Sequence, residues 1–159
     1  MNIRQSLKIL LTGTISIAAL SLGTTTASAT NDDANYFEGC SNPDTSGFKF
    51  KIHYNSGQNG AYRYIGYAVY NFDAIDVTDG NPQGVPLKFC VTGGSAPAPG
   101  SGQRIKNNAA SAENFHYKYM ARVYFSSGYK GAQDVMGPGQ HIDQFRNVYN
   151  ENASFQWTS

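Results

Sequence analysis

Two stretches of the chain repeat one short pattern of serine, glycine and alanine. Residues Ser56–Ala61 read SGQNGA, and residues Ser127–Ala132, which lie 71 positions later (127 minus 56), read SGYKGA. The correspondence runs on without a gap on both sides, so that Tyr54 falls on Phe125. Such a repeat predicts two related structural units, with chance similarity in a chain rich in Gly, Ser and Tyr as the alternative.

Each copy of the repeat is followed by a similar Asn-rich tail. The first tail, Asn107–Ser111, reads NNAAS, and the second tail, Asn150–Ser154, reads NENAS. The distance from repeat to tail differs between the two copies, because an extra stretch around residues 73–105 separates the first pair. We therefore expect two copies of strand, glycine turn, strand and tail, the first of them carrying an insertion.

Alternating apolar and polar residues predict β-strands around the repeat. Apolar side chains occupy every second position in three runs: Phe48, Phe50, Ile52 and Tyr54; Val85, Leu87, Phe89 and Val91; and Tyr117, Tyr119, Ala121, Val123 and Phe125. This period of two is that of a half-buried strand, and turn signals separate the runs. No stretch shows a long helical period, so the sequence predicts an all-β fold.

The first 29 residues have the three regions of a secretory signal peptide. Arg4 and Lys8 precede an apolar run from Ile9 to Leu22, and the small residues Ala27 and Ala29 mark a cleavage site. The apolar run is shorter than the roughly 20 residues that span a bilayer. We expect an exported, soluble protein that leaves the membrane after cleavage, with an uncleaved anchor as the alternative.

Composition and motifs limit the classes of partner and activity expected of the exported protein. Removing Arg4 and Lys8 leaves 10 basic residues against 11 acidic ones, so the charge gives no reason to expect binding to nucleic acid or to an anionic membrane. The three histidines are scattered, and no HExxH or Gly-x-Ser-x-Gly motif occurs. We therefore expect a protein that is not an enzyme, and we expect His53, on the polar side of a strand, to be solvated.

Two cysteines, Cys40 and Cys90, remain after export into an oxidising space, where a disulfide between them is expected rather than a reactive thiol. Residues 30–46 are polar and predict an irregular N-terminal arm tied down by Cys40, while residues 47–159 form one domain. The stretch 93–103, GGSAPAPGSGQ, predicts a flexible excursion within that domain rather than a linker between domains.

The second repeat resembles the Greek-key motif of the βγ-crystallin superfamily. Tyr124, Tyr129 and Gly131 match its aromatic, aromatic and glycine positions, and Asn107–Ala112 matches five of the six positions of its closing Asn/Ser motif. The first copy departs at its aromatic positions, where His53 and Gln58 stand. The resemblance implies a double Greek-key β-sandwich.

In that sandwich, motif one covers about residues 48–112 with the insertion around 73–105, and motif two covers about residues 117–157. The second tail departs from the superfamily pattern at Glu151 and Phe155.

Within this superfamily the chain is most similar to small secreted bacterial proteins grouped as metalloproteinase-type peptidase inhibitors, with killer-toxin-like relatives. The phrases VYFSSGYKG and NENASF of the second copy carry this likeness. It implies a monomeric inhibitor of a secreted peptidase, for which residues 93–103 are a candidate contact loop. Those inhibitors usually have more than one disulfide. The alternative is a calcium-stabilised binding module or a small antimicrobial protein.

The resemblance also implies a weak Ca²⁺ site built from both tails, since Ca²⁺ takes six to eight oxygen ligands. The candidate ligands are Asn107, Asn108, Ala109 and Ser111 in the first tail and Asn150, Asn152 and Ser154 in the second. The equal alternative is that these side chains cap turns through hydrogen bonds to the backbone.

The aromatic content, 11 Tyr, 9 Phe and a single Trp, raises a further alternative, carbohydrate binding, although the alternating placement of these residues favours a role in the core.

Overall fold

The computed structural model describes residues 26–41, 47–78 and 84–159. Most of the expected signal peptide and the turn signal at residues 79–82 therefore lie outside the described residues, and export remains a prediction. No helix in the described ranges is long and apolar enough to cross a membrane.

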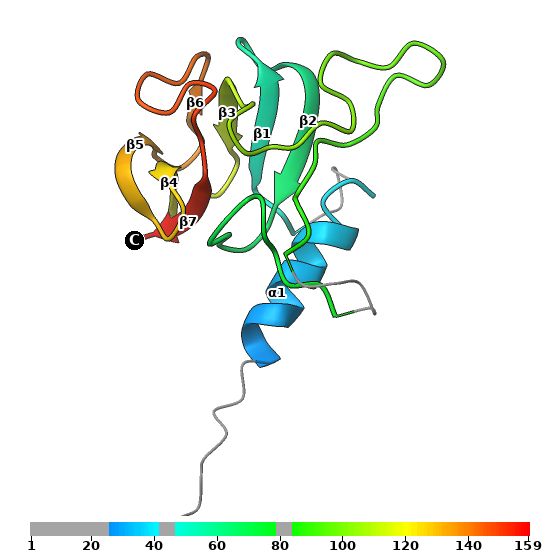
Figure 1. Ribbon diagram of the computed structural model, residues 1–159. Coiled ribbons are helices and arrows are strands. Elements are labelled where there is room, and N and C mark those ends of the chain that lie inside the picture. The colour runs from blue at the N-terminus through cyan, green and yellow to red at the C-terminus, as the bar shows by residue number, and fades with distance from the viewer. Residues whose placement is uncertain (1–25, 42–46, 79–83) are drawn as a thin grey trace, which may run out of the picture.

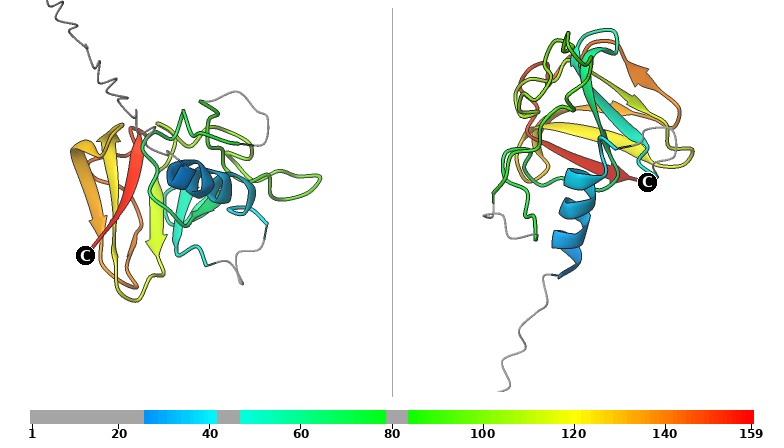
Figure 2. Two further views of the ribbon diagram at one scale, coloured as in Figure 1. Left: turned by 90° about the horizontal axis from the view of Figure 1, so that it is seen from below. Right: turned by 90° about the vertical axis from the view of Figure 1, so that its right-hand side faces the viewer.

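Residues Thr26–Phe37 form a helix, α1, so the expectation of an irregular arm over residues 30–46 is wrong for its first part. Ala27 and Ala29 of the expected cleavage site lie on this helix. Figures 1 and 2 show α1 projecting from one end of the β-structure. The helix lacks a clear apolar period, so contacts with the rest of the chain hold it in place rather than its own pattern.

Within the described residues, seven strands form two antiparallel sheets (Figure 1). The first sheet has the order β2-β1-β3-β6 and consists of β1 (Phe50–Asn55), β2 (Asn59–Ile65), β3 (Ser111–Asn114) and β6 (His141–Ile142). The second has the order β5-β4-β7 and consists of β4 (Met120–Ser126), β5 (Lys130–Met136) and β7 (Ser154–Thr158).

The repeat seen in the sequence is also a repeat of strand register. In the β1–β2 hairpin the pairing shifts between His53 and Asn55, and in the β4–β5 hairpin it shifts between Tyr124 and Ser126, each 71 positions later. The same offset relates the two hairpins along their whole length. The prediction of two related units is therefore confirmed.

The two halves exchange a strand with each other. Strand β6 of the second half pairs with β3 of the first, where Ala112 faces Ile142. In return, Val69 of the first half pairs with Phe155 of β7 through two backbone hydrogen bonds, of 2.8 and 3.0 Å. This reciprocal exchange gives each half a Greek-key connection. The expected all-β, double Greek-key β-sandwich is confirmed by this strand order.

The core lies between the two sheets. Phe50 of β1 stacks on Phe155 of β7 with ring centroids 4.1 Å apart, and Val69 and Val123 are fully buried beside them. Burying each such side chain stabilises the fold by about 1.5–3 kcal/mol. Two residues of the expected core pattern are wrongly placed, since Tyr117 is 88% exposed and Phe125 is 44% exposed.

The inserted segment contributes to this core instead of looping away from it. Val85 pairs with Ile75, and Ile105 donates its N–H to the carbonyl of Leu87 at 2.9 Å. Leu87 and Phe89 are buried, as the alternating pattern predicts, and Ile105 is buried beside them. The end of that pattern is wrong, because Val91 is 78% exposed.

Helix α1 is held to the first sheet by polar contacts. The buried guanidinium of Arg63 donates to the carbonyls of Asn35 and Tyr36 at the C-terminal end of the helix, where the helix dipole favours a cation. Burial lowers the pKa of Arg63 to about 10. The side chain of Asn35 accepts the N–H groups of Gly66 and Tyr67, so the helix end is bound from both sides.

The expected disulfide joins Cys40, after α1, to Cys90, in the insertion. The two cysteines are separated by 50 positions in the sequence.

Replacing both cysteines by Ser should lower the free energy of unfolding by up to about 4 kcal/mol, because the crosslink restricts the unfolded chain. Urea denaturation of the two proteins measures the difference. Reductant should bring the native protein to the variant's midpoint, and equal midpoints without reductant would contradict this role.

Candidate functional site

The two Asn-rich tails meet, and their backbones bond to each other reciprocally. Asn107 donates its N–H to the carbonyl of Asn152 at 2.9 Å, and Asn150 donates its N–H to the carbonyl of Ala109 at 2.9 Å. The N–H of Ala109 is bound by the side-chain oxygen of Asn152 at 3.0 Å. The structure thus brings together the residues in which a calcium site was expected.

The hydroxyl of Ser111 closes the hairpin of the first half. It donates to the carbonyl of Asn55 at 2.6 Å and accepts the N–H of Gln58 at 3.1 Å. Gln58 has a φ of +55°, a conformation in which its N–H needs a partner outside the strand ladder. The buried hydroxyl therefore satisfies both ends of a folded turn.

Ser154 performs the same role in the second half. Its hydroxyl donates to the carbonyl of Ser126 at 2.7 Å and accepts the N–H of Tyr129 at 3.1 Å. Tyr129 also has a positive φ, of +61°, and stands at the position that corresponds to Gln58. Both serines are completely buried.

These contacts show what the candidate calcium ligands do in the structure. Asn108 donates to the carbonyl of Arg104, and Lys106 lines a cavity of about 290 Å³ beside the second hairpin together with Glu151. With one lysine and one carboxylate residue in its lining, this cavity has no excess of negative charge to attract a divalent cation. No group of three or more His, Cys, Asp or Glu in the described ranges could hold a metal ion. In the structure the tail residues Ser111, Asn152 and Ser154 serve a hydrogen-bonded corner.

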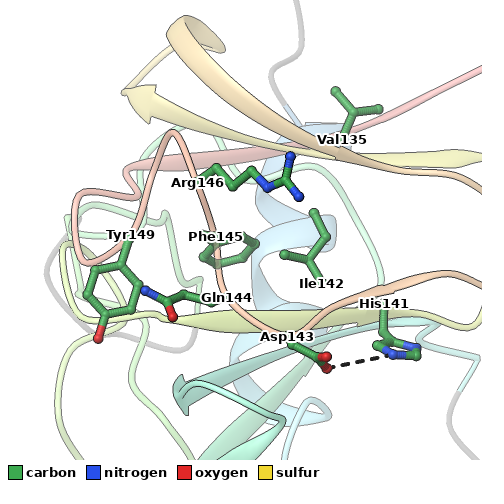
Figure 3. A pocket seen from close by; sticks show the side chains of 8 residues that line it. All are labelled: Val135, His141, Ile142, Asp143, Gln144, Phe145, Arg146 and Tyr149. Carbon is green, nitrogen blue, oxygen red and sulfur yellow. Dashed lines mark ion pairs between the residues drawn. The ribbon is translucent and has the colours of Figure 1, made fainter.

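A cavity of about 990 Å³ lies between β5 and β6 (Figure 3). It is lined by Val135, His141, Ile142, Asp143, Gln144, Phe145, Arg146 and Tyr149. His141 and Asp143 form an exposed ion pair with an N–O distance of 3.6 Å. None of the described residues in this lining is a Ser, Thr or Cys, so the pair has no adjacent nucleophile there. The absence of catalysis itself remains a prediction.

Asp134 fixes one wall of this cavity. Its buried carboxylate accepts the backbone N–H groups of Arg146, Asn147 and Val148 at 2.9–3.1 Å. No sequence pattern points to Asp134, because this residue lies in a strand and its partners lie 12 to 14 positions away. In the first half the equivalent position is Arg63, 71 positions earlier, which binds carbonyls instead.

His53 is buried and not solvated, contrary to the expectation. Only 2% of its surface is exposed, and its Nε2 bonds to Glu113 at 2.9 Å, while Lys51 lies 3.5 Å from the same carboxylate oxygen. Its Nδ1 has no hydrogen-bond partner among the described residues. Burial and the Lys51 charge lower the pKa of His53, and the bond to Glu113 opposes that shift.

The candidate contact loop has a hydrogen-bonded neck. Ser101 accepts the N–H of Thr92 at 3.3 Å and donates to the carbonyl of Thr92 at 3.2 Å. Ala98 donates to the same carbonyl, and Pro99 accepts the N–H of Ala61 in β2. Residues 91–99 therefore project from a base that is tied to the first sheet (Figure 1, green loop at the upper right).

Comparison with known proteins adds two structural likenesses. No family model matches the chain, and no curated protein matches it. One similar solved structure is described as "Evolution of the eye lens beta-gamma-crystallin domain fold", with 10% identity and a TM-score of 0.47 over 70% of this chain and 85% of that one. Another is a betagamma-crystallin domain from Flavobacterium johnsoniae, with 13% identity and a TM-score of 0.42 over 69% and 93%.

Replacing Ser111 or Ser154 by Ala should lower the free energy of unfolding by about 1–3 kcal/mol each, because two partly buried backbone groups lose their partner. The exposed Ser95→Ala variant is the control and should match the native protein. Thermal unfolding in EDTA and in millimolar Ca²⁺ measures both effects. A loss that appears only in Ca²⁺ would contradict the structural role and support a metal site.

The lowered pKa of His53 predicts a pH dependence of stability. The unfolded chain binds a proton near pH 6.5, whereas folded His53 binds it only at lower pH. The free energy of unfolding should therefore fall as the pH drops below about 6.5. Urea denaturation between pH 5 and 8 should show a shallower fall for His53→Gln than for the control His141→Gln, whose ring is exposed. Equal slopes in the two variants would contradict this assignment.

Proposed function

We propose that this protein is an exported, non-enzymatic binding protein that inhibits a secreted peptidase through the loop of residues 91–99. The Cys40–Cys90 disulfide is compatible with an oxidising extracellular space. The double Greek-key sandwich supports a binding module in general terms, and the projecting loop is the observation that points to inhibition.

The chemistry of the loop suits a narrow, apolar substrate cleft. Residues 91–99 read VTGGSAPAP and include no charged side chain. Val91 is 78% exposed, which makes it the largest apolar group that the loop offers to a partner. Two prolines, Pro97 and Pro99, reduce the freedom that the segment would lose on docking.

The base of the loop is rigid for a steric reason. Gly100 has a φ of +87°, and a Cβ at this position would lie 2.2 Å from the ring of Tyr54. The Tyr54 ring in turn packs edge-to-face on Phe89 with centroids 5.7 Å apart. The loop therefore leaves the domain from a packed aromatic base beside the disulfide at Cys90. These contacts supply some of the rigidity that additional disulfides provide in the inhibitors that the sequence resembles.

The loop also contains a defined turn at its tip. Ala96 donates its N–H to the carbonyl of Gly93 at 3.0 Å, and Gly93 has a φ of +93°. A Cβ on Gly93 would come within 2.4 Å of the Ala96 carbonyl oxygen, so the turn requires glycine there. The tip that a peptidase would meet is thus compact, and the exposed Val91 lies at the base of the loop, directly before the neck formed by Thr92 and Ser101.

The second candidate, a calcium-stabilised module or an antimicrobial protein, depends on the tail residues. Ser111 and Ser154 are engaged in the hairpin corners, and the nearby cavity carries Lys106. No contact of the described residues favours this candidate over the inhibitor, so the loop has the stronger support.

The proposed function predicts inhibition that depends on Val91. The full-length exported protein should inhibit at least one member of a panel of secreted metallo- and serine peptidases at micromolar concentration. Val91→Asp should weaken that inhibition at least about tenfold, because a carboxylate would be desolvated in an apolar cleft. Val135→Asp, at an exposed valine on β5, is the matched control and should inhibit like the native protein. No inhibition by the native protein across the panel would refute the proposal.

A further inference from the structure

A separate cavity of about 330 Å³ lies near the C-terminus, where β7 ends. It is lined by Gly47, Lys49, Gly66, His116, Tyr119, Trp157, Thr158 and Ser159. In Figure 1 the C-terminus lies at the lower left, on the side of the molecule opposite the projecting loop. The cavity therefore belongs neither to the loop of residues 91–99 nor to the corners formed by the tails.

Aromatic rings form the walls of this cavity. The ring of His116 lies 5.2 Å from Trp157 and 4.7 Å from Tyr119, measured between centroids. Tyr117 stacks on His116 at 5.0 Å with an interplanar angle of 19°, and it is 88% exposed. The rings thus continue from the cavity to the surface, where a large exposed aromatic has no role in packing the core.

His116 is fixed in one tautomer. Its Nδ1 accepts two backbone N–H groups, from Lys118 at 2.9 Å and from Tyr119 at 3.0 Å. A neutral imidazole whose Nδ1 is an acceptor carries its proton on Nε2. No hydrogen bond to Nε2 is found in the part of the chain that the structure describes, so this N–H is an oriented donor for a ligand.

The loop that carries His116 is rigidly supported. The side-chain amide of the buried Asn114 donates to the carbonyls of Tyr119, Met136 and Gly137, and its oxygen accepts the N–H of His116. Four hydrogen bonds from one side chain hold the turn that places the imidazole. A site preorganised in this way loses little entropy when it binds.

The part of Trp157 that lines the cavity is apolar. Its indole N–H donates to the carbonyl of Gly66 at 2.9 Å, and its ring packs on Phe155 at 5.1 Å. Because the polar edge already has a partner, the exposed part of the indole is apolar surface. Gly66 must lack a side chain, since a Cβ there would lie 2.1 Å from the ring of Phe48.

The charges around the cavity restrict the class of ligand. Lys49 lines the opening, and the ammonium of Lys118 lies 5.2 Å from the centroid of the Tyr119 ring. Two lysines disfavour a cationic guest in an aromatic site. The volume lies at the lower end of the range for small-molecule sites and suits a single ring. Apolar ring faces beside a fixed donor match a pyranose, which has an apolar C–H face and an equatorial rim of hydroxyl groups.

We propose that this cavity binds a pyranose unit of a polysaccharide, with Trp157, Tyr119 and Tyr117 as stacking surface and the Nε2 of His116 as donor. Lys49 favours a sugar that carries a carboxylate. The site is independent of the proposed inhibition, and it would hold the exported protein on a glycan while the loop on the opposite side stays free.

The single tryptophan of the chain makes this proposal directly measurable. We would titrate the full protein with oligosaccharides of glucose, N-acetylglucosamine and galacturonic acid and follow tryptophan fluorescence, with saturation-transfer NMR as a second readout. At least one sugar should quench or shift the emission, and the acidic oligosaccharide should bind more tightly than the neutral ones. No response in either readout up to about 10 mM sugar would overturn the proposal.

Variants locate the site. Tyr117→Ala removes a ring that is 88% exposed and should weaken binding about tenfold without changing the melting temperature. Lys49→Ala should remove the preference for the acidic sugar. Tyr70→Ala, which deletes a ring that is 64% exposed elsewhere on the surface, is the matched control and should bind normally.

Sugar binding that is unchanged in Tyr117→Ala would overturn the proposed location. Peptidase inhibition should be the same in Tyr117→Ala as in the native protein, so failure of the sugar site and failure of the inhibitory loop can be told apart.

Discussion

Two buried serine hydroxyls hold the corners on which the whole fold depends. Ser111 and Ser154 each join a folded β-hairpin to the tail that closes the same half. The hairpins contain residues with positive φ whose N–H groups point away from the strands, so without the hydroxyls these partly buried groups would lose their partners. With the corners closed, the tails lie side by side at the centre of the molecule, and the sheets can exchange strands.

Much of this architecture can be predicted from the sequence, because the hairpins and strands require particular residue types at particular positions. The glycines and serines of the repeat appear at fixed spacing since the hairpin geometry accepts few other residues. Alternation marks the strands because each has one buried face. Helix α1 leaves no such trace, since it is bound through Asn35 and Arg63 rather than through an apolar stripe. The exposure of Tyr117 and Phe125 could not be predicted from the sequence either. An aromatic residue in an alternating run follows the pattern of a buried residue whether or not its ring is covered.

The candidate sites are less visible in the sequence than the fold. The tails were predicted to meet and do so, but the choice between metal ligand and turn cap depends on where each oxygen points. The pairing of His53 with Glu113 joins residues 60 positions apart, and strand pairing between β1 and β3 brings them together. The aromatic cavity likewise could not be predicted from the sequence, since its residues Lys49, His116 and Trp157 come from three separate segments. Proximity of this kind is a property of topology, which residue patterns describe only indirectly.

The reciprocal pairing of the two halves also protects the edges of their sheets. Each half adds a segment to the edge of its neighbour's sheet, as β6 does to β3 and Val69 does to Phe155. A single copy would leave these edges, with their unpaired N–H and C=O groups, open to pairing with another molecule, whereas the repeat covers them within one chain. Arg63 and Asp134, opposite charges at equivalent positions of the two copies, show that the copies differ in what this position binds.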